Sequence, residues 1–185
     1  MNTLFINACV RNDSRTLILA KYLLRKLDCN VTELNLEQEN IQALNGKTLE
    51  HRDLCIRTGK LNDPILRYAH QFATADTIVI AAPFWDLSFP SSLKNYIESI
   101  TVSGITFTYV DNIPKGLCNA KKLYFVSTCG GPFSYDFGCN YIKTLAQRFY
   151  GIPEFDCFKA EFLDIVGADV EGILSDAMKA IDAAF

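Results

Sequence analysis

The sequence has little of what metal-binding and disulfide-rich proteins contain. Among its 185 residues there are only two histidines, and no two of the seven cysteines form a Cys-x-x-Cys pair. This excludes zinc-ribbon and dithiol redox patterns. Because the cysteines are odd in number and scattered, we expect a cytoplasmic protein whose thiols mostly pack in its interior.

Long hydrophobic runs and a strong charge of one sign are also missing. No apolar run approaches the ~18 residues of a membrane span, and the N-terminus lacks the pattern of a signal peptide. Eighteen basic and twenty-one acidic residues give a net charge of −3, so neither nucleic acid nor an anionic membrane is an expected partner. With six prolines and ten glycines, the composition predicts a single globular domain, residues 1–185.

What the sequence contains is a regular exchange of short β-rich runs with helical patterns. Leu17, Ala20, Leu24 and Leu27 form the apolar face of one such helix. Five strands interleaved with five helices predict a three-layer α/β fold with a doubly wound parallel sheet. The predicted strands are Thr3–Ala8, Val31–Leu36, Thr77–Ala82, Leu123–Thr128 and Cys157–Phe162.

The strand sequences also indicate their order in the sheet. Runs one, three and four are almost entirely apolar, as expected of strands buried on both faces. Runs two and five alternate in polarity, with Leu34, Phe158 and Phe162 on the apolar side, which is typical of edge strands. The predicted order is therefore 2-1-3-4-5, the flavodoxin-like arrangement. Ligands of such sheets bind outside the carboxyl ends of the strands, so we expect the loops after strands one, three and four to carry the chemistry.

The first of these loops, 9–16 (CVRNDSRT), is predicted to bind phosphate. It opens a helix with Ser14 or Asp13 as N-cap, and a helix N-terminus presents free amides and partial positive charge. The hydroxyls of Ser14 and Thr16 and the guanidinium groups of Arg11 and Arg15 add hydrogen-bond donors. The alternative is an ordinary capped helix with two solvated arginines.

The second loop, 82–90 (APFWDLSFP), is rich in aromatic residues. Phe84, Phe89 and Trp85, the only tryptophan, are expected at the carboxyl edge of the sheet. Large aromatic side chains there can flank a planar ring. The alternative is that they fold back into the core, and we expect this for at least one of them.

The third loop, 129–138 (CGGPFSYDFG), begins with a Gly-Gly pair that lets backbone amides approach a ligand closely. Phe133 and Tyr135 are placed to close over that ligand. A plain turn is the alternative for this loop by itself. Three such loops at one crevice, with a phosphate at one end and a flat ring at the other, describe FMN.

Two features lie outside this prediction. His51 and His70 have no metal partners at ligand spacing, so we expect no metal site. The segment from Glu37 to Leu61 is long for a connection in a compact domain. We interpret it as a lid or an interface segment.

The most specific stretch of the sequence is Ala81–Tyr109, followed by Lys115–Gly131. It contains, in order, an A-P-aromatic loop, P-x-x-L-K-x-Y, G-x-T-F-x-Y, and then G-L and K-K before a strand ending in Gly-Gly. In these residues the chain resembles the flavodoxin-like NAD(P)H-dependent FMN oxidoreductases, which include azoreductases and NAD(P)H:quinone reductases. The likeness runs from about Thr3 to the last helix.

The resemblance implies which residues hold FMN: Ser14, Arg15 and Thr16 the phosphate, the aromatic loop and the Gly-Gly loop the ring. The sequence departs from many members at Cys9, at Val10 and at Asp86, where they have serine, proline and asparagine. A carboxylate close to a reduced flavin is unfavourable, so the side chain of Asp86 is expected to point away while its backbone amide serves the ring. The predicted cofactor-binding residues are Arg11, Ser14, Arg15, Thr16, Pro83, Phe84, Trp85, Asp86, Leu87, Thr128, Cys129, Gly130, Gly131 and Phe133.

The resemblance also implies the reaction. FMN would take hydride from NADH or NADPH and pass it, by ping-pong kinetics, to a quinone, azo compound or other electron-poor acceptor. The chemistry would lie on FMN, and no further catalytic residue is expected. The family is typically homodimeric, and the 37–61 segment and Gly104–Tyr109 are the expected contact regions.

Two alternatives remain open. Cys9 and Arg15, followed by Thr16, have the spacing of low-molecular-weight tyrosine phosphatases, in which a thiolate attacks phosphorus. Against this, the loop lacks a glycine and no late Asp-Pro supplies the acid. A flavodoxin-type electron carrier would keep FMN without the enzyme, although such carriers tend to be shorter and more acidic.

Overall fold

A five-stranded parallel sheet with strand order β2-β1-β3-β6-β7 forms the centre of the computed structural model, which describes residues 2–185. Counted over the strands of this sheet, the order is the predicted 2-1-3-4-5, and the predicted flavodoxin-like fold class is confirmed. The all-apolar runs are the central strands, and the alternating runs are the edges. The strands are β1 Asn2–Asn7, β2 Asn30–Asn35, β3 Thr77–Ala81, β6 Lys122–Thr128 and β7 Glu154–Ala160.

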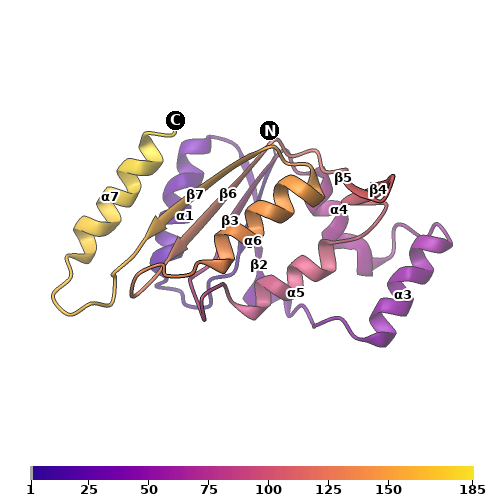
Figure 1. Cartoon of the computed structure of the whole chain (residues 1–185), viewed down its shortest axis with the longest axis horizontal. Coiled ribbons are helices and arrows are strands. Elements are labelled where there is room, and N and C mark those ends of the chain that lie inside the picture. Colours follow the sequence, from indigo (N-terminus) through magenta and orange to yellow (C-terminus); the bar gives the residue numbers. More distant parts are fainter. Residues whose placement is uncertain (1) are drawn as a thin grey trace.

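Helices cover both faces of the sheet (Figure 1). Side chains of β1 point alternately to the two faces, so Phe5 packs with residues of α1 and α7, while Leu4 packs with residues of α4, α5 and α6. The result is the predicted three-layer arrangement. The helices are α1 Arg15–Leu27, α4 Arg67–Thr74, α5 Ser91–Ile100, α6 Phe137–Leu145 and α7 Val170–Asp182.

Two short elements add detail to the predicted helices. A 3₁₀ turn, Pro64–Leu66, precedes α4, and the side chain of Asp63 caps it. A π-helical turn, Ala146–Tyr150, ends α6, and Gly151 follows with a left-handed φ of 74°. This is the glycine stop that the sequence predicts. None of the helices among residues 2–185 is long and apolar enough to cross a membrane.

Two parts of the structure were not predicted as regular elements. The segment interpreted as a lid or interface contains α2 Leu36–Glu39 and α3 Gly46–Arg57, and α3 lies at one end of the molecule (Figure 1). Between α5 and β6 the chain forms an antiparallel hairpin of β4 Phe107–Val110 and β5 Ile113–Gly116.

The end of the fifth strand differs from the prediction. β7 begins at Glu154 and ends at Ala160, before Phe162. The backbone turns at Phe162, where φ is 65°, and its side chain is 43% exposed. The expectation that Phe162 continues the apolar face of the strand is therefore wrong, because the chain has already left the sheet there.

Candidate active site

A cavity of about 330 Å³ lies at the carboxyl ends of β1, β3 and β6, where the three predicted loops meet. A fourth segment, which follows β7, completes it. The residues that line the cavity are Val10, Arg11, Asp13, Ser14, Arg15, Thr16, Pro83, Phe84, Trp85, Thr128, Cys129, Gly130, Leu163 and Asp164.

The first loop leads into the N-terminus of α1. Ser14 is the N-cap, and its hydroxyl oxygen accepts a hydrogen bond from the amide of Leu17 at 3.4 Å. Arg15 and Thr16, the first two residues of the helix, line the cavity. Amides in the first turn of a helix lack intrahelical partners, and they carry the partial positive charge of its dipole. This end of the cavity is therefore built to receive an anion.

The side chain of Arg15 connects the first loop to the segment after β7. Its Nη1 donates to the carbonyl oxygen of Leu163 at 3.0 Å and to Oδ1 of Asp164 at 2.6 Å. The prediction missed both partners. The rule that pointed to the loops after three strands points equally to Asp164, because it follows the fifth strand of the same sheet.

Thr16 and Thr128 join the first loop to the end of β6. Their hydroxyl oxygens are 2.7 Å apart and buried. One hydroxyl donates to the other, so one hydroxyl proton of the pair remains for a further acceptor. The contact gives Thr16 a structural role, and its role as a phosphate ligand stays a prediction.

The aromatic residues of the second loop divide between the cavity and the core. Phe84 and Trp85 line the cavity, and Trp85 is 42% exposed. Phe89 packs against Tyr141, with ring centroids 5.8 Å apart, at the edge of the main core. Folding back into the core, the alternative for this loop, therefore applies to Phe89.

Asp86 and Leu87 form a tight turn between Trp85 and Ser88. Trp85 and Ser88 exchange two backbone hydrogen bonds, at 3.2 and 2.8 Å. Asp86 and Leu87 have left-handed φ angles of 49° and 64°, which cost non-glycine residues ~1–3 kcal/mol each. Both side chains are exposed and do not line the cavity, so the turn is defined by its backbone.

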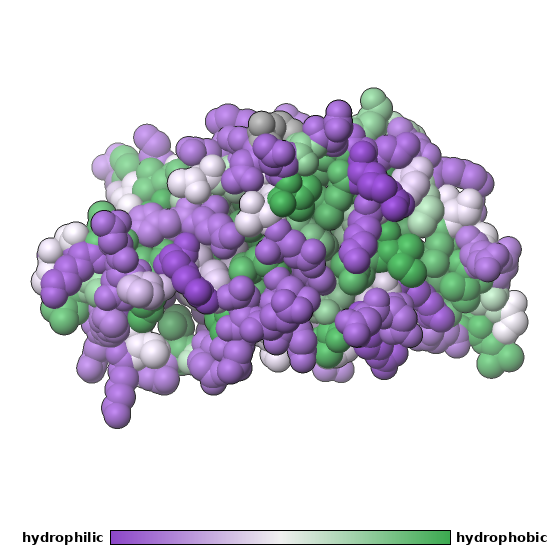
Figure 2. Space-filling model, turned by 180° about the vertical axis from the view of Figure 1, so that it is seen from behind, coloured by the Kyte–Doolittle hydropathy of each residue, from purple (hydrophilic) through white to green (hydrophobic). Residues whose placement is uncertain are grey.

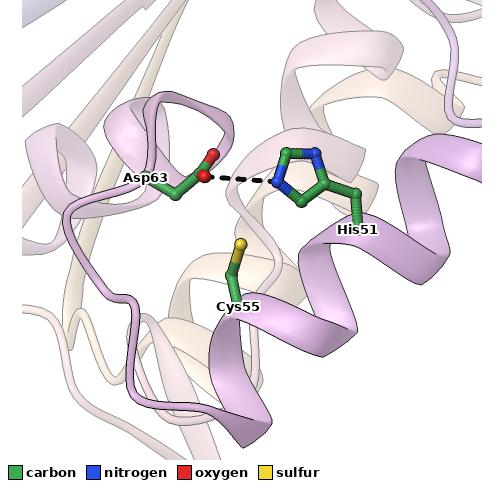
Figure 3. A group of neighbouring side chains, drawn as sticks. All are labelled: His51, Cys55 and Asp63. Atoms are coloured by element: carbon green, nitrogen blue, oxygen red, sulfur yellow. Dashed lines mark hydrogen bonds and ion pairs between the residues drawn. The ribbon is translucent and has the colours of Figure 1, made fainter.

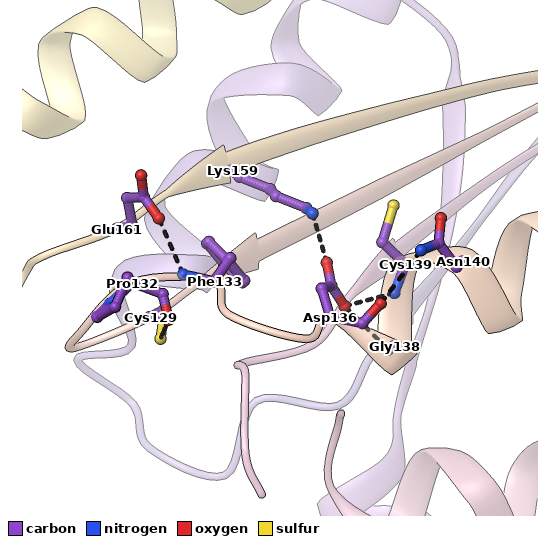
Figure 4. Close-up of polar contacts among 9 residues, drawn as sticks. All are labelled: Cys129, Pro132, Phe133, Asp136, Gly138, Cys139, Asn140, Lys159 and Glu161. Carbon is purple, nitrogen blue, oxygen red and sulfur yellow. Dashed lines mark hydrogen bonds and ion pairs between the residues drawn. The ribbon is translucent and has the colours of Figure 1, made fainter. Parts of the chain in front are cut away.

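The third loop is fixed to the end of β7 (Figure 4). Glu161 accepts a hydrogen bond from the amide of Phe133 at 2.9 Å, and Lys159 forms an ion pair with Asp136. Asp136 also caps α6 by accepting from the amides of Gly138 and Cys139.

Of the third-loop residues predicted to contact the cofactor, Cys129 and Gly130 line the cavity, while Gly131 and Phe133 do not. The ring of Phe133 instead packs edge-on against that of Phe84, with centroids 4.8 Å apart. The side chain of Tyr135 is 78% exposed, so it does not close over the cavity as expected.

The position of Cys9 disfavours the phosphatase alternative. Its side chain is buried and does not line the cavity. Its Sγ lies 3.8 Å from the carbonyl oxygen of Ala81, and burial raises the pKa of the thiol to about 11. At neutral pH this cysteine is a protonated packing residue, whereas phosphatase chemistry requires a thiolate.

The donor chemistry of the cavity fits FMN. One end has a helix N-terminus, the hydroxyl of Ser14 and the guanidinium of Arg11, which suit a phosphate. The other end has the aromatic side chains of Phe84 and Trp85 and the backbone of Gly130, which suit a flat ring with polar edges.

Comparisons with known proteins agree with this geometry. A family model described as flavodoxin-like fold matches residues 1–185. An FMN-dependent NADH:quinone oxidoreductase 2 of Clostridium acetobutylicum is 40% identical over 167 residues, which cover 87% of this chain and 82% of the relative. An FMN-dependent NADH:quinone oxidoreductase of Coprothermobacter proteolyticus is 35% identical over 189 residues, covering 95% and 94%.

A solved structure supports the fold. An FMN-dependent NADH-azoreductase from Bacillus anthracis, in complex with FMN, superposes with a TM-score of 0.83 at 22% identity and covers 100% of this chain and 97% of that one. Together with the family model and the curated relatives, this establishes that the chain belongs to the flavodoxin-like family of FMN-dependent NADH:quinone oxidoreductases.

Proposed function

We propose that the chain is an FMN-dependent NAD(P)H oxidoreductase that reduces quinones, azo compounds or related electron-poor acceptors. The observation that carries this proposal is one cavity that is lined both by the N-terminus of α1 and by the aromatic residues Phe84 and Trp85. The names of its curated relatives, FMN-dependent NADH:quinone oxidoreductases, support the same activity.

The protein's own residues bind and orient. The amides of Arg15 and Thr16 and the side chain of Arg11 would hold the phosphate, and Phe84, Trp85 and the backbone of Gly130 would hold the ring. When bound, FMN supplies the two-electron chemistry that takes hydride from NAD(P)H and gives it to the acceptor.

The remaining polar residues of the cavity position the binding groups. Asp164 fixes the guanidinium of Arg15, and Thr128 fixes Thr16, so both groups are oriented before a ligand arrives. The exposed side chain of Asp86 keeps its carboxylate out of the cavity lining, as the sequence predicts for a site that holds an electron-rich ring.

Anaerobic titration of the purified protein with NADH and with NADPH tests this function. We expect a flavin spectrum that either nucleotide bleaches, followed by reoxidation when a quinone is added. Parallel lines in double-reciprocal plots would support a shared site used in turn. A flavoprotein that no pyridine nucleotide reduces would favour the electron carrier instead.

A homodimer is part of this proposal. A groove between α3, α5 and α6 contains Ile97, Tyr141 and Phe149, and the neighbouring hairpin exposes Tyr109 and Ile113. The face of the molecule seen in Figure 2 is mostly hydrophilic, with hydrophobic residues between the hydrophilic ones. The groove and hairpin together are therefore the better candidate for a surface that a second copy covers.

Light scattering after size exclusion tests the dimer. We expect about twice the mass of 20.7 kDa for the wild type and a shift towards the monomer for Ile113→Glu. Val166→Glu is the control, because Val166 is also an exposed apolar residue but lies between β7 and α7. A monomeric wild type would contradict the dimer.

Two further expectations remain predictions from composition: that residues 1–185 form a single domain and that the protein is cytoplasmic.

A further inference from the structure

Three metal-ligating side chains meet at the junction of α3 and the 3₁₀ turn before α4 (Figure 3). His51 and Cys55 are four residues apart on α3, which places them on one face of the helix. Asp63 comes from the next segment, and the ligand atoms of the three residues all lie within 4.8 Å of one another. The expectation that His51 has no partners at ligand spacing is therefore wrong.

Existing hydrogen bonds orient the carboxylate of Asp63. Its Oδ1 accepts from the amide of Ile65 at 3.1 Å, which caps the 3₁₀ turn, and its Oδ2 lies 3.2 Å from Nε2 of His51. The side chains of His51 and Cys55 point from α3 towards this carboxylate (Figure 3).

The cluster is closed on one side and open on the other. Cys55 is buried, with 2% exposure, and it packs among Leu66 and Ala69. The side chain of His51 is 54% exposed. A metal ion held here would have a sulfur ligand on the protein side and room for water on the solvent side.

We propose that His51, Cys55 and Asp63 bind a zinc ion, with water as the fourth ligand. A thiolate, an imidazole and a carboxylate are the donors that Zn²⁺ takes in proteins, whereas Mg²⁺ and Ca²⁺ prefer oxygen ligands alone. Tetrahedral bonds of ~2.0–2.3 Å place ligand atoms ~3.3–3.8 Å apart. The present separations of up to 4.8 Å therefore have to shorten by at most ~1.5 Å. Binding displaces the proton of the Cys55 thiol to solvent.

The consequence of this site is structural. Cys55 is the only residue of α3 that is fully buried, and the helix is otherwise held by the partly buried Ile56 and by a hydrogen bond from Arg52 to the carbonyl oxygen of Glu98. A zinc ion would add bonds from α3 to Asp63 and close the loop 58–62 between them. The three ligands share no residue with the cavity at the carboxyl edge. Zinc binding is therefore independent of the proposed oxidoreductase activity.

Equilibrium dialysis of the purified protein against zinc chloride, followed by metal analysis, tests the proposal. We expect one zinc ion per chain, and a dissociation constant raised by more than ~10-fold in His51→Ala, Cys55→Ser and Asp63→Asn. His51→Ala removes an exposed side chain, and asparagine can still cap the 3₁₀ turn, so both variants should fold as the wild type does. Circular dichroism checks this.

His70→Ala and Cys29→Ser are matched controls. His70 is the only other histidine, and its Nε2 contacts the carbonyl oxygen of Leu61 in the same loop. Cys29 is a partly exposed free thiol at the end of α1. Both variants should bind zinc as the wild type does, and zinc should raise the melting temperature of the controls but not of His51→Ala.

X-ray absorption at the zinc edge identifies the ligands. The wild type should show one sulfur at ~2.3 Å and nitrogen or oxygen neighbours at ~2.0–2.1 Å. The proposal is overturned if the wild type binds no zinc, if the ligand variants bind it as tightly as the controls, or if the spectrum contains no sulfur shell.

Discussion

The loops at the carboxyl edge of the sheet and the segment 37–61 are held in place by different kinds of contact. At the carboxyl edge, hydrogen bonds run directly to the sheet, as between Thr16 and Thr128 or between Glu161 and the amide of Phe133. In the other segment, α3 fully buries only Cys55, and its side-chain bonds to neighbouring elements are the exposed contact of His51 with Asp63 and the bond from Arg52 to the carbonyl oxygen of Glu98. The loops around the cavity are therefore predicted to be more rigid than the helix.

The difference shows that regular secondary structure and rigidity are separate properties. A helix that buries one residue gains little from packing, and most helical stability in proteins comes from packing. Irregular loops become rigid when several of their polar groups are bonded to a buried sheet. The cavity of this protein needs rigidity, because groups that are oriented in advance discriminate better between ligands.

Hydrogen exchange gives the largest expected difference between the two regions. Amides of α3 should exchange through local opening, whereas the loop amides of Phe84 and Cys129, which donate to carbonyl oxygens of the sheet, should exchange only through global unfolding. With a global stability of ~5 kcal/mol or more, protection of these loop amides should exceed that of α3 by at least ~10³-fold when a chelator is present. Equal protection in both regions would contradict the comparison, and added zinc should narrow the gap.

Replacing Trp85 by alanine should weaken flavin binding by about 10- to 100-fold, which corresponds to the loss of one stacked aromatic ring. Because Trp85 is 42% exposed, the free energy of unfolding should change by less than ~0.5 kcal/mol. Fluorescence titration of the flavin-free protein measures the affinity, and Leu54→Ala on α3 is the control. An unchanged affinity would mean that the indole does not contact the flavin.

Gly130→Ala should destabilise the protein by ~1–3 kcal/mol, as expected for overpacking. A Cβ atom at Gly130 would lie 2.3 Å from Oδ2 and 3.1 Å from Cβ of Asp164, so the whole side chain that holds Arg15 must move. Gly131→Ala is the matched control, because a Cβ atom there meets nothing within 4 Å. Urea unfolding of both variants measures the difference. Equal midpoints for Gly130→Ala and Gly131→Ala would show that the side chain of Asp164 can move away from a Cβ atom at position 130 without loss of stability.

A double-mutant cycle with Thr16→Val and Thr128→Val should give a coupling free energy of ~1 kcal/mol, measured by urea unfolding. In the wild type the two buried hydroxyl oxygens are 2.7 Å apart, and each single substitution leaves one of them without its partner. Replacing both removes the unsatisfied group, so the double variant should be more stable than the sum of the single effects predicts. If the two changes in the free energy of unfolding are strictly additive, the hydroxyl groups of Thr16 and Thr128 do not interact.

The last effect is absent at neutral pH and appears only at alkaline pH. The pKa of Cys9 is raised by burial from 9.0 to about 11, so the unfolded chain loses its thiol proton first. The stability contributed by this group is complete below pH 9 and falls as the pH rises from 9 to 11. Comparison of melting temperatures should show a shallower alkaline decline for Cys9→Ala than for the wild type. Identical slopes would contradict the burial of the thiol.

The sheet and the position of the cavity could be predicted from the sequence because both follow from local patterns. Apolar runs distinguish central from edge strands, and the carboxyl edge of a parallel sheet is a topological consequence of strand order. The N-cap role of Ser14 follows from its side chain and its place before an apolar helical face.

What the sequence did not reveal depends on tertiary contacts. The pairing of Arg15 with Asp164 joins residues 149 positions apart, and neither residue type predicts its partner. The helix α3 escaped prediction because it lacks an apolar face, even though Asn45 and Thr48 form a capping box at its start. Because this helix was not predicted, the four-residue spacing of His51 and Cys55 was not interpreted as placing both side chains on one helical face.

The charged residues around the cavity bear on how fast ligands arrive. Arg11 and Arg15 contribute two positive charges to its lining, and Asp13 and Asp164 contribute two negative ones. These four charges balance, and the whole chain has a net charge of −3, so no positive field draws a phosphate to the cavity from afar. Association rates with anionic ligands should therefore change little between low and physiological ionic strength. A preference for phosphate would then depend on contact with the amides of α1, where the proposed function places it.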